Sequence, residues 1–146
     1  MNLSALDIAM NLAAAGVSVA NDRLSIADRA YACPAKEWVT GPFSSALWRL
    51  QTELEIDRWL EEANDCDDFA RVAAGFAQIL HRRTPDRPPA TALAFGEFWY
   101  LRTDGAGHAI NLALHTSGAI TFYEPQTRRE VILTEAEKES GTLIRF

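Results

Sequence analysis

Three side chains in this sequence have the types and spacing needed for thiol chemistry: a cysteine, a histidine and a carboxylate. Cys66 opens a stretch with helical periodicity, His108 lies in a stretch of alternating apolar residues, and Glu124 ends the next such stretch. In a thiol hydrolase the histidine takes the thiol proton and later returns it to the leaving group, while the acid orients the imidazole. These residue types predict Cys66 as nucleophile, His108 as base and Glu124 as orienting acid.

The segment from Asn64 to Leu80 is expected to form the helix that positions Cys66. Its apolar residues recur at spacings of three and four, so they form one stripe that faces a core. Asn64 and Asp65 are good N-cap residues, which places the start of the helix beside Cys66. The unpaired backbone N–H groups there stabilise a thiolate, and the N–H of Cys66 itself is a candidate donor to an oxyanion.

The charges around Cys66 oppose its activation. Asp65, Asp67 and Asp68 flank it in the sequence, and neighbouring negative charge raises the pKa of a thiol. A reactive Cys66 therefore needs a cation beside it, either a histidinium or a metal ion. The alternative is that Cys66 is a structural side chain, since free cysteine often packs as a small hydrophobe.

His108 and Glu124 are expected to meet because neighbouring antiparallel strands carry them. Each shares a strand face with a row of apolar residues, and both rows face the core only if paired residue numbers sum to an even value. Glu124 or Gln126 then lies directly across from His108, with the other as its diagonal neighbour. Gln126 is a second candidate oxyanion donor. The alternative is a structural His108–Glu124 hydrogen bond with Cys66 elsewhere.

The order of the patterns predicts an α+β fold with helices before an antiparallel sheet. Helices are expected at 3–15, at 46–51 after a cap at Ser44 or Ser45, and at 64–80. A proline-rich polar loop is expected at 81–89. Strands are expected at 91–101, 108–115, 119–123, 129–133 and 142–146, with a helical turn at 135–139. We predict a single domain, residues 1–146, with a helical part at 1–58 and the catalytic helix and sheet at 59–146.

The composition limits the class of protein. The 146 residues suffice for one core without disulfide staples, and a bridge between Cys33 and Cys66 would silence Cys66. A formal charge of -6 gives no basic field for nucleic acid or anionic lipid. No apolar run is long enough to cross a membrane, and the N-terminus lacks the basic region of a signal peptide. We therefore expect a cytoplasmic protein, which lysis could release.

Three motifs, in this order, resemble those of the papain-like C-terminal domain of mushroom agglutinins and of similar small bacterial and bacteriophage proteins. They are Asp-Cys-Asp-Asp-Phe-Ala at 65–70, Gly-His-Ala-Ile-Asn at 107–111 and Glu-Pro-Gln-Thr at 124–127. The resemblance covers about residues 59–133. It implies a papain-like fold with Cys66 as nucleophile, His108 as base and Glu124 as orienting acid.

The resemblance also implies a cation and a substrate contact. Proteolysis by the agglutinin domains depends on divalent cations such as calcium, which makes Asp67 and Asp68 the expected ligands of an ion. Trp59 falls where that family carries an aromatic residue near the substrate groove. The substrate implied is a peptide or amide. The sequence lacks the sugar-binding domain of the agglutinins, so the resemblance does not imply glycan recognition.

Two other functions are compatible with the same residues. NlpC-type cell-wall peptidases also start a helix at Asp-Cys and place a histidine on a strand, although Glu124 fits the agglutinin pattern better. A catalytically silent phage or prophage structural or accessory protein would keep the fold and bind a partner, which the acidic flank of Cys66 favours. The reactivity of the Cys66 thiol separates the enzymes from the binding protein.

Overall fold

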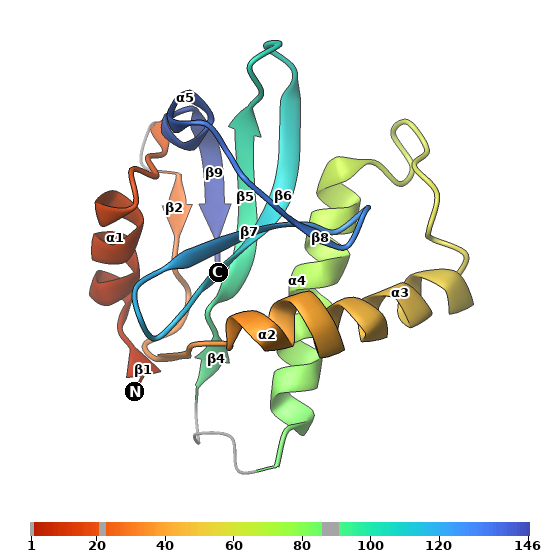
Figure 1. Ribbon diagram of the computed structural model, residues 1–146, viewed down its shortest axis with the longest axis horizontal. Coiled ribbons are helices and arrows are strands. Elements are labelled where there is room, and N and C mark those ends of the chain that lie inside the picture. Colours follow the sequence, from red (N-terminus) through yellow and green to blue (C-terminus); the bar gives the residue numbers. More distant parts are fainter. Residues whose placement is uncertain (1, 21–22, 86–90) are drawn as a thin grey trace.

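The structure, a computed structural model, describes residues 2–20, 23–85 and 91–146 and is a mixed α+β fold (Figure 1). Within these residues one sheet has six strands in the order β2-β9-β5-β6-β7-β8, and a second has three in the order β1-β3-β4. The large sheet contains β2 (Leu24–Ser25), β5 (Phe95–Leu101), β6 (Gly107–Leu114), β7 (Ile120–Glu124), β8 (Arg129–Val131) and β9 (Gly141–Arg145). The small sheet contains β1 (Asn2–Leu3), β3 (Tyr31–Ala32) and β4 (Ala92–Leu93).

Helices cover both faces of the large sheet (Figure 1). In chain order they are α1 (Ala5–Ala14), α2 (Lys36–Trp38), the π-helical turn η2 (Val39–Phe43), α3 (Ser44–Glu53), α4 (Cys66–Arg83) and α5 (Glu135–Glu139). The first helix packs on one face of the sheet, while α3 and α4 pack on the other. No helix in the described part of the chain has both the length and the apolar character needed to span a membrane.

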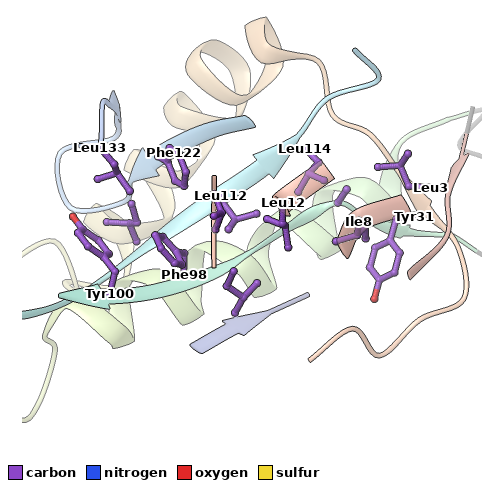
Figure 2. Packing of buried hydrophobic residues seen from close by; sticks show 14 residues of the cluster. Leu3, Ile8, Leu12, Tyr31, Phe98, Tyr100, Leu112, Leu114, Phe122 and Leu133 are labelled. Atoms are coloured by element: carbon purple, nitrogen blue, oxygen red, sulfur yellow. The ribbon is translucent and has the colours of Figure 1, made fainter. Parts of the chain in front are cut away.

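Alternating residues of the central strands build two separate cores. Even-numbered side chains such as Phe98 and Leu112 pack with Ile8 and Leu12 of α1 (Figure 2). Odd-numbered side chains pack against α3 and α4, where the Phe43 ring lies 4.9 Å from that of Phe95. The period of two in β5, β6 and β7 therefore commits each strand to both cores.

The register between β6 and β7 is the even one that the sequence predicts. Asn111 pairs with Tyr123 and Leu112 pairs with Phe122. This register keeps both apolar rows in the α1 core, since a shift by one residue would turn one row to solvent. The ladder ends at Asn111, so the first part of β6 pairs with β5 and leaves its other edge uncovered by β7.

The predicted α+β class is confirmed, and the differences from the sequence-based elements have local causes. Helix α4 continues to Arg83, into the start of the loop expected at 81–89, and residues 86–90 of that loop lie outside the described residues. The strand expected at 91–101 is divided at Ala94, whose N–H donates to Ala32 of β3 and whose carbonyl accepts from Leu114 of β6. Ala94 thus joins the two sheets.

The close approach of β5 and β9 gives a stability prediction. A Cβ at Gly96 would lie 2.3 Å from the carbonyl oxygen of Arg145, whereas a Cβ at Gly75, inside α4, meets nothing within 4 Å. Gly96→Ala should lower the free energy of unfolding by about 1–3 kcal/mol through overpacking. Gly75→Ala, the control, should raise it by about 0.5–1 kcal/mol because alanine favours the helix.

Urea denaturation of the two variants and the wild type measures both effects. A Gly96→Ala protein as stable as the wild type would contradict the close packing of β5 on β9.

Candidate functional site

Helix α4 begins where the sequence predicts, with Asp65 as N-cap and Cys66 as its first residue. Asp65 and Asp68 form a capping box, in which the N–H of Asp65 lies 3.4 Å from the Asp68 carboxylate. The side chain of Asn64 holds the preceding loop by donating to the carbonyls of Ile56 and Arg58, at 3.1 and 2.6 Å. These contacts fix the backbone at the helix start and therefore the position of the Cys66 side chain.

The Cys66 thiol lies half-buried at the edge of β6 that β7 leaves uncovered. Burial is the largest effect on it and raises the pKa of the thiol above its usual value, and the charges of Asp65 and Asp67 raise it further. The N–H groups of Ala109 and of Cys66 itself act in the opposite direction without reversing the shift. Burial and the two aspartates therefore favour the protonated form of the thiol.

His108 and Glu124 meet as predicted. The Nε2 atom of His108 lies 2.7 Å from Oε2 of Glu124, and the two side chains are 18% and 13% exposed. Because a carboxylate accepts, the imidazole carries its proton on Nε2. The other oxygen of Glu124 accepts from the backbone N–H of Gln126 at 3.1 Å. The Tyr100 ring packs edge-on against the imidazole, with 5.8 Å between the ring centres.

The structure brings together two of the three predicted triad side chains by hydrogen bonding. Among the described residues no hydrogen bond joins Cys66 to His108, and the thiol instead contacts the N–H of the adjacent residue, Ala109. Gln126 contributes its backbone N–H to Glu124, whereas the prediction concerned its side chain. Trp59 lies before α4 and is 54% exposed.

The three aspartates gather beside Cys66, with carboxylate oxygens within 4.8 Å of one another. Arg71, one turn further along α4, binds Asp67 at 2.7 Å and Asp68 at 3.0 Å. The buried Oδ1 atom of Asp65 has no donor among the described residues. A proton shared with Asp67 is the largest cause that raises the pKa of Asp65, and the same contact lowers the pKa of Asp67.

Sequence reasoning did not find the residues that attach α4 to the sheet. Asn111 is fully buried, and its side-chain amide donates to the carbonyls of Ala70 at 2.8 Å and Gly96 at 3.1 Å. Its signal in the sequence is a polar residue within an otherwise apolar strand. Tyr100, which packs against His108, looks like any other core aromatic, so no pattern separates it from its neighbours.

Comparison with known proteins identifies the fold. No protein-family model and no curated protein matches the chain. A solved structure described as the PSL1a-E64 complex is similar, with a TM-score of 0.74 and 20% identity over 99% of this chain and 51% of that chain. Polyporus squamosus lectin bound to the human-type influenza-binding epitope Neu5Aca2-6Galb1-4GlcNAc gives a TM-score of 0.73, with 18% identity over 99% of this chain and 49% of that chain. The chain has a mushroom-lectin-like fold.

The chain spans about half of each of these solved chains. The second of these structures is described as a lectin bound to a carbohydrate epitope, which contradicts the predicted cysteine hydrolase with a peptide or amide substrate. The site supplies a physical reason, since burial and two aspartates disfavour the Cys66 thiolate and no hydrogen bond among the described residues joins Cys66 to His108. The non-catalytic binding protein considered from the sequence fits better than the protease.

Removal of one negative charge beside Cys66 tests the electrostatics of the site. Asp65→Asn should lower the pKa of the Cys66 thiol because one of the charges that raise it is gone. Asparagine keeps the helix start, since it is an equally good N-cap. The rate of iodoacetamide alkylation at Cys66, followed by mass spectrometry against pH, should then rise at lower pH than in the wild type.

The matched control is Asp7→Asn, in the capping box of α1, which should leave the profile unchanged. Superimposable profiles for Asp65→Asn and the wild type would show that Asp65 does not influence the thiol.

Proposed function

We propose that this chain is a non-catalytic binding protein whose ligand contacts the surface around the start of α4. The observation that carries the proposal is the environment of Cys66: burial and two aspartates raise the pKa of its thiol, and among the described residues no hydrogen bond joins it to His108. A protonated thiol is a poor nucleophile. In this proposal the papain-like arrangement, a cysteine at a helix start against an antiparallel sheet, serves to position binding groups.

We propose a carbohydrate as the ligand class. One similar structure is described as bound to Neu5Aca2-6Galb1-4GlcNAc, and two side chains of the predicted site suit a sugar. An exposed indole such as Trp59 offers an apolar face with a polar tip, and the partly exposed Glu124 accepts hydrogen bonds from hydroxyl groups. The aspartates around Cys66 repel a carboxylate, so the neutral Galb1-4GlcNAc part should bind better than the whole sialylated trisaccharide.

Calorimetric titration with the two glycans tests the ligand class. Trp59→Ala should weaken binding of Galb1-4GlcNAc about tenfold, as truncation of an aromatic anchor does. Trp48→Ala is the matched control, because Trp48 on α3 is 53% exposed, close to the 54% of Trp59. It should leave the affinity unchanged.

One outcome would contradict the carbohydrate ligand, and another would contradict the non-catalytic role. If neither glycan binds, the carbohydrate assignment fails. If the wild type cleaves an unfolded protein substrate and Cys66→Ala does not, the non-catalytic assignment fails.

We also propose that the aspartates beside Cys66 hold a calcium ion. The donor set fits, since carboxylate oxygens are the ligands that calcium prefers, and the buried Oδ1 of Asp65 has no donor among the described residues. Asp67 and Asp68 already bind Arg71, so the ion competes with the guanidinium as well as with the proton that Asp65 and Asp67 share. This competition predicts weak binding.

Thermal unfolding with calcium and with a chelator tests the ion site. At a calcium concentration about tenfold above the dissociation constant, the gain in unfolding free energy is about 1.4 kcal/mol, or roughly 3–6 °C in melting temperature. The gain should shrink in acid, because the raised pKa of Asp65 favours the protonated carboxyl that cannot bind calcium.

Asp67→Asn should abolish the calcium effect on melting, while Asp104→Asn, in the turn between β5 and β6, should not. Identical melting curves of the wild type in calcium and in chelator would rule out the ion site.

A further inference from the structure

The turn that follows Glu124 has a backbone that needs support. Residues 125–128 connect β7 to β8, and Arg128 has a φ of 58°. This left-handed conformation is unfavourable for residues other than glycine, so surrounding contacts must hold it. The N–H of Arg128 closes the turn by donating to the carbonyl of Glu124 at 2.7 Å.

Helix α3 supplies those contacts from two of its residues. Gln51 is fully buried, and its amide donates to the carbonyl of Pro125 at 3.2 Å while its oxygen accepts from the Arg128 guanidinium at 3.2 Å. The same guanidinium nitrogen donates to the carbonyl of Gln126 at 3.0 Å. At the other end of the helix the Ser44 hydroxyl lies 3.3 Å from the carbonyl of Arg128.

The 125–128 turn also holds the Glu124 carboxylate in place. The N–H of Gln126, inside the clamped turn, donates to one oxygen of Glu124, and the other oxygen accepts from His108. Each oxygen of Glu124 therefore has a hydrogen-bond donor, and the turn as well as the strand sets the direction of the carboxylate. A continuous path of hydrogen bonds runs from the interior of α3 to the imidazole ring.

We infer that Gln51 and Arg128 are positioning residues of the site: their hydrogen bonds fix the 125–128 turn so that Glu124 keeps the proton of His108 on Nε2. Gln51 suits this role because an amide combines a donor and an acceptor, which a leucine or a glutamate of similar size does not. The inference deepens the proposed function and rests on it for its biological meaning. The proton position itself can be measured without a ligand.

Nitrogen-15 NMR of the imidazole ring tests the inference, because ring nitrogens with and without a proton have well-separated shifts. The wild type should show a single tautomer with its proton on Nε2 of His108. Gln51→Leu and Arg128→Met should each give a mixture of the two tautomers, since the turn no longer directs the carboxylate. Two variants are used so that the failure of one to fold leaves the other.

Gln78→Leu is the matched control. Gln78 also bridges two backbone groups, the N–H and carbonyl of Leu93, both at 2.9 Å, but it does so on α4 away from the site. It should lower the melting temperature and leave the tautomer of His108 unchanged. If Gln51→Leu and Arg128→Met lose stability and keep the single Nε2 tautomer, their role is structural and the inference is overturned.

The same variants separate this inference from the proposed function. A mixed tautomer in Gln51→Leu together with no glycan binding by the wild type would support the positioning role and refute the ligand class. Glycan binding by the wild type with an unchanged tautomer in both variants would support the ligand class and refute the positioning role.

Discussion

The site depends on the attachment of α4 to the face of the large sheet at β6. The buried amide of Asn111 joins the two elements by donating to Ala70 of the helix and Gly96 of β5. Because β7 pairs with β6 only from Asn111 onward, the N–H of Ala109 is left for the Cys66 thiol. One buried polar side chain thus sets where the helix start, with its cysteine and its aspartates, meets the strand that carries His108.

The carboxylates of the site act on two different groups, the imidazole of His108 and the thiol of Cys66. The Glu124 carboxylate binds the imidazole and fixes its tautomer, whereas Asp67 and Asp68 bind Arg71 and the charges of Asp65 and Asp67 reach the thiol. Their effect on Cys66 adds to that of burial, and both raise the pKa of the thiol. The backbone amides of the helix start oppose this shift without overcoming it. A site of this kind offers fixed acceptors and donors to a ligand but disfavours an ionised sulfur.

The sequence predicts what depends on local pattern. Period-two alternation with both apolar rows buried fixes the even register of β6 and β7, which in turn brings Glu124 to His108. Capping residues place the start of α4 at Cys66. The short strands β1 and β3 are not predicted, since two residues carry no periodicity. The role of Gln51 is equally hidden, because its partners lie more than seventy positions away.

The direct test of the account is the ionisation of the Cys66 thiol. In the Cys33→Ala variant Cys66 is the one remaining cysteine, so the ultraviolet absorbance of the thiolate against pH reports on it alone. We expect this absorbance to appear only at alkaline pH, because burial and the aspartates raise the pKa of the thiol, in agreement with a non-catalytic binding site. A thiolate that is already present at neutral pH would contradict it, because it would mean that the charge of His108 outweighs burial and the aspartates.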